Sequence, residues 1–357
     1  MLHNPDRHEA LQASPWDDTQ VRQAIIDIVS RTEQAFSPDG DWAQHPLDAD
    51  AGAGPQRSVP PLYHGTCGVF WALHYLQDVG AVTLQRSYYP HADALLRSNR
   101  AWLGAEADKE AASYLMGDTP ILMWRLGHEP GAATTQRLLE LIGGNIDHPA
   151  RELMWGSPGT LLAALFLHER TGDGRFADLF RATAARLWSQ LLWSEELQCH
   201  YWTQDLYGSQ SNYIDAVHGF VATASPLIRG QALLDAADWT AWQRCIQNTV
   251  QRTAVWNGGH ANWRAQLTSP AAKDMLMQYC HGAPGFIVCL ADLPGAALDT
   301  LLVAAGDAVW AAGPLLKGSN LCHGTGGNGY AFLKLHERTG NAVWLDRAHA
   351  FAMHGIA

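Results

Sequence analysis

Two cysteine–histidine pairs occur in the same short frame of the sequence, Cys-His-Gly-x-x-Gly. The first is Cys280-His281 in "YCHGAPG", and the second is Cys322-His323 in "LCHGTGG". The first turn of a helix has free backbone amides that favour an anion, so the pKa of a thiol placed there is lowered. Thiolates and imidazoles are zinc ligands. The two pairs therefore predict a zinc (Zn²⁺) site, and the alternative is two buried cysteines without a metal.

The number of ligands decides what such a site does. If all four side chains bind, the site is closed and structural; if three bind, one position stays open for catalysis. Spacing alone leaves both arrangements open. The chain is long and starts without an export signal, so metal binding or catalysis is favoured over disulfides for its cysteines. A third pair, Cys199-His200 in "QCHYW", lacks the glycines that follow and is not expected to bind metal.

The glycine frame recurs along the chain and is followed each time by an apolar, helix-like run. "LCHGTGGNGYAFLKLHERTG" has an echo in "MWGSPGTLLAALFLHERTG", which lacks the cysteine and histidine but ends in the same six residues. The final glycines of the two copies, Gly172 and Gly340, are typical of the residue that ends a helix. Six such turns begin at Gly65, Gly117, Gly156, Gly219, Gly282 and Gly324.

This organisation predicts the fold. Two helices for each turn, with weak strand signals, indicate an all-α fold, an α/α toroid made of two concentric rings of helices. In such a ring the residue before the first glycine of each turn points toward the axis. No linker divides the chain, so we expect one domain over residues 1–357. Within it, residues 1–20 and 37–61 are expected to be loop or partly disordered.

The composition excludes several classes of protein. Hydrophobic residues make up 47% of the 357 residues and charged residues 17%, which suits a large interior. The formal net charge is −11 and no basic block is present, so we expect no nucleic-acid partner. The polar start is not a signal peptide, and no apolar run has the length of a transmembrane segment. We expect a cytoplasmic protein.

The turns resemble those of the lanthionine synthetase C (LanC) family. "YCHGAPG", "LCHGTGGNGYAFL" and "AVHGF" carry the resemblance, in particular to the LanC-like branch, and it covers the chain from about His64 to His354. It implies a seven-fold α/α toroid. Because six turns are visible and a seventh would fall beyond Ala357, we expect the last repeat to be missing.

The resemblance also implies the ligands of one zinc ion. They are Cys280, Cys322 and His323, while a water or a substrate thiol takes the fourth position, and His281 is a neighbour of the site. The implied reaction is the addition of a thiol to dehydroalanine or dehydrobutyrine in a dehydrated peptide or protein, which forms a thioether. The thiol belongs to glutathione or to a cysteine of the peptide. Zinc would lower the pKa of that thiol.

Three further residues acquire roles from the resemblance. His218 lies in a turn like that of the family's catalytic histidine, and would protonate the enolate or prepare the thiol. Glu152 has the position of an acidic residue that orients this histidine. Lys317 resembles a lysine of the LanC-like branch that would stabilise the enolate or bind a carboxylate or phosphate, and its alternative is a solvated surface lysine.

One departure from the family pattern bears on the reaction. Lanthipeptide cyclases carry an arginine a few residues before the first zinc cysteine. In this sequence Leu276 precedes that cysteine, and Lys273 is the nearest cation. The departure favours glutathione-adding activity over ring closure.

Two rival functions remain open at this stage. The first is a non-catalytic module that binds zinc or glutathione. The second is an α/α-barrel glycosidase, suggested by the fifteen tryptophans and by acidic residues such as Asp118 and Glu152.

Overall fold

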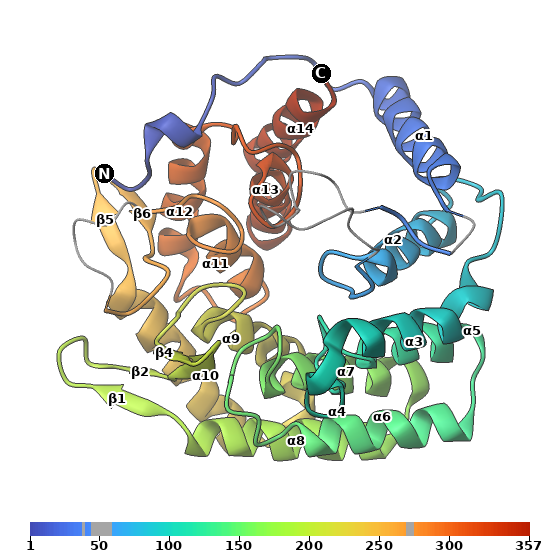
Figure 1. The fold of residues 1–357 in the computed structure, drawn as a ribbon. Helices are drawn as coiled ribbons and strands as arrows, with labels where there is room; N and C mark the ends of the chain where they lie inside the picture. The colour runs from blue at the N-terminus through green and yellow to red at the C-terminus, as the bar shows by residue number, and fades with distance from the viewer. Residues whose placement is uncertain (38–39, 44–58, 269–274) are drawn as a thin grey trace. The chain divides into compact units, whose positions relative to one another are not determined.

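The computed structural model describes residues 1–37, 40–43, 59–268 and 275–357, and in these residues the chain is mostly helical (Figure 1). The contacts divide it into two compact units. Unit 1 comprises Met1–Asp17, Pro149–Leu153 and Arg181–Ala357, and unit 2 comprises Asp18–His148 and Met154–Phe180. The expectation of a single domain stays a prediction.

Unit 2 has an aromatic core. Phe70 stacks on Tyr88 and on Trp124, with ring centroids 5.1 and 5.0 Å apart. Cys67 is buried in the same core, and burial raises the pKa of its thiol, so this cysteine has a structural role. The helices of unit 2 are α1 (Asp18–Gln34), α2 (Thr66–Asp78), α3 (Ala92–Leu103), α4 (Ala107–Glu110), α5 (Thr119–His128), α6 (Ala132–Gly144) and α7 (Ser157–Thr171).

In unit 1 a short apolar helix, α11 (Ala283–Leu290), packs between α9 (Phe220–Arg229) and α13 (Thr325–Thr339) (Figure 1). Each of these helices begins directly after one of the glycines noted above, so their first turns lie close to the histidines and cysteines of those turns. The boundary between the units falls within α8 (Gly174–Ser189). The remaining helices are α9 (Phe220–Arg229), α10 (Ala236–Thr253), α11 (Ala283–Leu290), α12 (Asp299–Ala312), α13 (Thr325–Thr339) and α14 (Ala342–Ile356).

The repeated sequence motif Leu-His-Glu-Arg-Thr-Gly ends both α7 and α13, and the two helix ends have the same geometry. Gly172 and Gly340 have left-handed backbones, with φ of 69° and 67°. Their amides donate to the carbonyls of His168 and His336, each at 2.8 Å. A residue with a Cβ is strained in this conformation, so glycine is the natural choice. The prediction that these glycines end helices is confirmed.

The arginine of each copy of this motif forms hydrogen bonds that connect its helix to a neighbouring helix. Arg338 donates from Nη1 to the carbonyls of Ala291 and Leu293, just beyond the end of α11, at 2.7 and 2.8 Å. Arg170 likewise donates from Nη1 to the carbonyl of Met123 in α5, at 2.9 Å. Hydrogen bonds from a charged donor are stronger than neutral ones. The repeated motif therefore has two roles: its glycine ends the helix, and its arginine bonds the helix to a neighbouring helix.

Three short antiparallel hairpins, which were not predicted from the sequence, interrupt the helices of unit 1. Two of them turn at Tyr207-Gly208 and Gly258-Gly259, where φ is positive at both residues, as in the turns that match the twist of paired strands. Each strand has three residues, too few for alternation to be visible in the sequence. The pairs are β1 (Leu192–Ser194) with β2 (Cys199–Tyr201), β3 (Gln204–Leu206) with β4 (Ser209–Ser211), and β5 (Val255–Asn257) with β6 (His260–Asn262).

The predicted loops have different outcomes. The first α-helix begins at Asp18, and before it the chain has only a 3₁₀ turn at Pro5–Arg7 and an isolated bridge from His8 to Leu315, so the predicted loop over residues 1–20 is three residues too long. This segment is held in place, because the amide of Glu9 donates to the carbonyl of Pro314 at 3.0 Å. Most of the predicted loop over residues 37–61 lies outside the described residues.

Candidate metal centre

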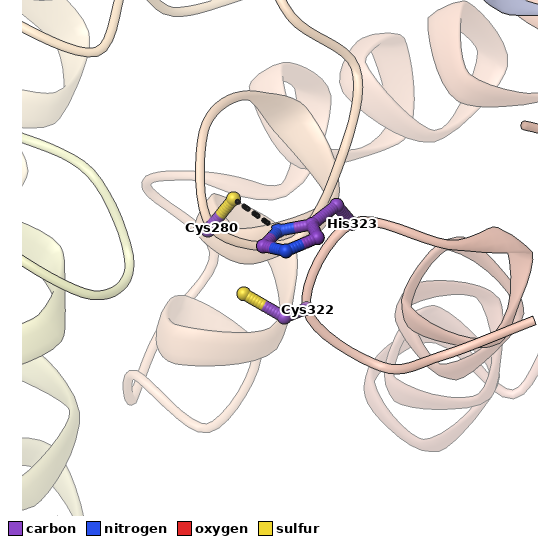
Figure 2. A group of neighbouring side chains, drawn as sticks. All are labelled: Cys280, Cys322 and His323. Atoms are coloured by element: carbon purple, nitrogen blue, oxygen red, sulfur yellow. Dashed lines mark hydrogen bonds between the residues drawn. The ribbon is translucent and has the colours of Figure 1, made fainter. Parts of the chain in front are cut away.

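A cluster of metal-type ligands lies where the turns before α11 and α13 meet. One ligand atom from each of Cys280, Cys322 and His323 lies within 4.8 Å of the other two, and Figure 2 shows the side chains pointing toward one another. The Sγ atom of Cys280 is 3.4 Å from Nδ1 of His323. The amide of Cys280 donates to the carbonyl of Cys322 at 3.0 Å, which fixes the spacing of the two turns. Elsewhere in the described chain no other group of three or more such side chains gathers in this way.

Glycine makes both turns possible. Gly282 has φ of 118°, and a Cβ there would lie 2.1 Å from the carbonyl oxygen of Leu276. A Cβ on Gly324 would lie 2.4 Å from the carbonyl oxygen of Gly318. The chain therefore folds back on itself closely just before each helix. This close approach places the preceding cysteine and histidine beside the first free amides of the helix.

The donor set fits zinc. The hydrogen bond with Cys322, burial, and the charge of Cys322 raise the pKa of the Cys280 thiol above its ordinary value, whereas the helix N-terminus alone was expected to lower it. Two neighbouring thiols resist ionising together, and a cation that binds thiolate overcomes this resistance. Two sulfurs and one imidazole nitrogen form a three-ligand set of the kind that leaves a fourth, open position in catalytic zinc sites.

His281 has another partner. Its Nδ1 atom lies 2.7 Å from Oδ2 of Asp215, a buried carboxylate, and His281 is not part of the cluster of three. This arrangement favours the three-ligand alternative over the closed set of four. Asp215 also accepts the amide of His218 through Oδ1, at 2.8 Å.

Asp215 was not among the site residues predicted from the sequence, although its spacing from His218 is a signal. Asp215 stands three residues before His218, and Asn320 stands three residues before His323. Each of these side chains accepts the amide of its histidine, at 2.8 and 2.9 Å. A short polar side chain at this spacing is typical of a residue that holds a turn by bonding to its backbone.

His218 and Glu152 form a second pair beside the cluster. Nδ1 of His218 lies 2.9 Å from Oε2 of Glu152, whose side chain is fully buried. Burial lowers the pKa of His218, but the hydrogen bond and charge of Glu152, with the charges of Asp215 and Cys322, raise it above the ordinary value overall. The ring of His218 is 6.5 Å from the ring of His281, centroid to centroid, so the pair faces the turn that carries Cys280.

The remaining candidate residues lie outside this arrangement. Lys317 is exposed in the loop before Cys322 and forms no ion pair with any residue that the structure describes. Asp118, in unit 2, accepts from Nδ2 of Asn99 at 3.0 Å and from Nε of Arg100 at 2.9 Å, which gives this buried carboxylate a structural role. Cys199 is buried in β2.

The comparison with known families decides the identity. A family profile described as lanthionine synthetase C-like protein matches residues 59–355. The chain belongs to this family. None of its described helices combines the length and the apolar character needed to cross a membrane.

Two curated relatives and one solved structure are similar to the chain. It is 26% identical over 245 residues to "Glutathione S-transferase LANCL1" of Danio rerio, which covers 63% of this chain and 57% of the relative. It is 29% identical over 215 residues to "LanC-like protein GCL1" of Arabidopsis thaliana, which covers 57% of this chain and 46% of the relative. The alignments thus span about half the length of these relatives. Nisin cyclase matches with a TM-score of 0.54 at 14% identity, over 91% of this chain and 84% of that one, and this likeness supports the predicted α/α toroid.

Proposed function

We propose that this LanC-like protein adds a thiol to dehydroalanine or dehydrobutyrine in a peptide or protein, in a zinc-dependent reaction that forms a thioether. The observation that carries the proposal is the cluster of Cys280, Cys322 and His323 with the buried pair of His218 and Glu152 beside it. Glutathione is the favoured thiol, ahead of a peptide cysteine, since a relative is named a glutathione S-transferase. A cytoplasmic location stays a prediction.

The cluster supplies the place for the thiol. Cys280, Cys322 and His323 would hold the zinc ion, which lowers the pKa of a thiol bound at the open position. The N-termini of α11 and α13 start next to these ligands, and their dipoles favour the negative charge of the sulfurs. Asn320 holds the turn of His323 through the backbone, so the ligand is positioned before substrate arrives.

His218 supplies the proton. When the thiolate sulfur bonds to the β-carbon, the electron pair of the carbon–carbon double bond moves toward the carbonyl, and the α-carbon then takes a proton. His218 is suited to give this proton because Glu152 favours its charged form. The proton released by the incoming thiol restores the imidazolium. Glu152 is buried and holds the ring through Nδ1, so that Nε2 would be the atom that gives the proton to the substrate.

Lys317 would act on the substrate from the exposed loop before Cys322. Its ammonium is available to a carboxylate or phosphate of the incoming peptide or thiol. The dyad of His218 and Glu152 is what favours an enzyme over a non-catalytic zinc or glutathione module. Binding alone does not require a buried carboxylate that orients a histidine.

A model peptide tests the proposal. The protein is incubated with a dehydroalanine peptide and glutathione, and the thioether product is measured by mass spectrometry over time. We expect the wild type to form the adduct, and His218→Ala to keep its zinc while the addition slows by at least ~10²-fold. His200→Ala is the matched control, since His200 lies in β2 and packs against Trp193, and its rate is expected to equal that of the wild type.

Each other outcome has a clear meaning. Zinc-dependent binding of glutathione without any adduct would support the non-catalytic module. Equal rates in His218→Ala and the wild type would remove His218 from the mechanism and leave the zinc site untouched.

A further inference from the structure

The first part of the N-terminal strap, residues 2–16, contacts the two loops that lead to the cysteines of the cluster, and its later residues contact α14. The side-chain amide of Asn262 donates to the carbonyls of both Leu2 and Leu276, at 2.6 and 2.9 Å, which joins the strap to the loop before Cys280. The amide of Leu316 donates to the carbonyl of Arg7 at 3.1 Å, which joins the strap to the loop before Cys322.

A chain of two side-chain hydrogen bonds runs from the strap to a sulfur of the cluster. Nη2 of Arg7 donates to Oε1 of Gln278 at 3.2 Å. Nε2 of Gln278 donates to Sγ of Cys280 at 2.9 Å. Gln278 is 4% exposed and Cys280 is 5% exposed, so the second bond is shielded from water.

The orientation of the glutamine amide follows from the chemistry of its neighbour. A guanidinium has only donors, so the atom of Gln278 that faces Arg7 must be the oxygen. The NH₂ group is then directed at the sulfur of Cys280, which must act as the acceptor. A thiolate accepts such a bond better than a thiol, because the bond to a charged acceptor is stronger.

We propose that Arg7 and Gln278 are positioning residues that deliver an N–H donor to the sulfur of Cys280 and thereby tune it as a metal ligand. The charge on Arg7 polarises the amide, since linked hydrogen bonds strengthen one another. The N–H donor draws electron density from the sulfur and holds its direction. Partners of this kind around metal ligands typically change metal affinity by about 10–100-fold. The strap then contributes to the metal centre, because it carries Arg7. This inference rests on the proposed zinc site.

The test uses the full-length protein and two measurements that do not depend on turnover. Zinc affinity is measured by competition with a colorimetric chelator, and the sulfur-to-metal charge-transfer band is recorded after loading with Co²⁺. In Gln278→Met, which keeps the shape but removes the donor, we expect zinc affinity to fall about 10–100-fold. The cobalt band should move to lower energy, because a sulfur without the N–H bond gives up an electron more easily.

Two strap variants separate the hydrogen-bond chain from simple docking of the strap. Arg7→Gln removes the charge and should shift affinity and band in the same direction as Gln278→Met, by less. Glu9→Gln is the matched control, because Glu9 holds the strap through His354 at 3.0 Å and takes no part in the chain. It should leave both readouts unchanged. If Gln278→Met fails to fold, Arg7→Gln decides the matter.

The outcomes distinguish this inference from the proposed function. A wild type that binds zinc, with affinity and cobalt band unchanged in Gln278→Met and Arg7→Gln, would overturn the role of these two residues alone. An equal loss in Glu9→Gln and Arg7→Gln would overturn it as well, because strap docking would then explain the effect. A wild type that binds no zinc would overturn both proposals.

Discussion

The cysteines of this chain differ in their surroundings. Cys245 and Cys289 are buried, and burial raises the pKa of each thiol to about 12, as expected for cysteines that only fill space. Cys280 and Cys322 instead have each other, an imidazole and an amide donor as neighbours. The neighbouring side chains, and not the residue type alone, distinguish the candidate ligand cysteines from the others.

Removal of one ligand sulfur tests the cluster. Cys322→Ala should lose most of the bound zinc, because two remaining ligands hold this ion weakly. Zinc per chain is measured by elemental analysis after purification without chelators. Cys289→Ala, which changes a buried cysteine of α11 outside the cluster, should keep its zinc. Well under one zinc per wild-type chain under these conditions would contradict the predicted site.

The pair of Glu152 and His218 makes a prediction about pH. Glu152 opposes the effect of burial and raises the pKa of His218, so in Glu152→Gln the charge is lost, burial remains, and the pKa of His218 should fall. If His218 acts as an acid, the alkaline limb of kcat/KM moves to lower pH. The pH profile of thioether formation measures this shift, and the exposed Glu196→Gln serves as the control. An alkaline limb that stays in place would show that His218 does not act as this acid.

At the scale of the elements, the repeated helix end provides a matched pair of variants. The side chain of Arg338 is 8% exposed and donates to the carbonyls of Ala291, Leu293 and Gly295. Arg170 makes one bond of this kind, to Met123. Removing Arg338 leaves more carbonyls without a donor, so Arg338→Ala should lower the free energy of unfolding by about 3 kcal/mol and Arg170→Ala by about 1.5 kcal/mol. Urea unfolding measures both. A larger loss in Arg170→Ala would contradict this account of the repeat.

At the scale of the whole molecule, every residue of the candidate metal centre belongs to unit 1. Binding that is specific to the folded state stabilises it, by about 2.7 kcal/mol when the free ligand is 100 times its Kd. Removal of zinc by a chelator should therefore increase amide exchange in α11 and α13, and exchange in α2 and α5 shows whether unit 2 opens with unit 1. Hydrogen-exchange mass spectrometry makes this measurement.

The same experiment tests the expectation of a single domain. If both units lose protection together, they open as one cooperative body, in agreement with one domain over residues 1–357. No change in either unit would count against zinc binding by the folded chain. The expectation that the last repeat of the toroid is missing stays a prediction.

The sequence by itself determined the helical fold and the positions of the turns. Gly340 ends a helix, and Gly282 lets two backbone segments approach closely. Each acts through its own backbone conformation, so the neighbouring residues in the sequence are enough to predict its role. The resemblance of the cysteine turns to a known family then indicated Cys280, Cys322 and His323 as a set. Hairpins of three-residue strands carried too little pattern to be predicted.

Only the tertiary structure decided which partner each side chain has. It paired His281 with Asp215 and thereby separated this histidine from the cluster, and it brought Arg7 to Gln278, which are 271 residues apart in the sequence. Such partners depend on how distant segments pack, and no local propensity or spacing encodes that packing. Short sequence motifs indicate which residues are the ligands. The protonation and orientation of these ligands depend on hydrogen-bond partners that only the folded chain places beside them.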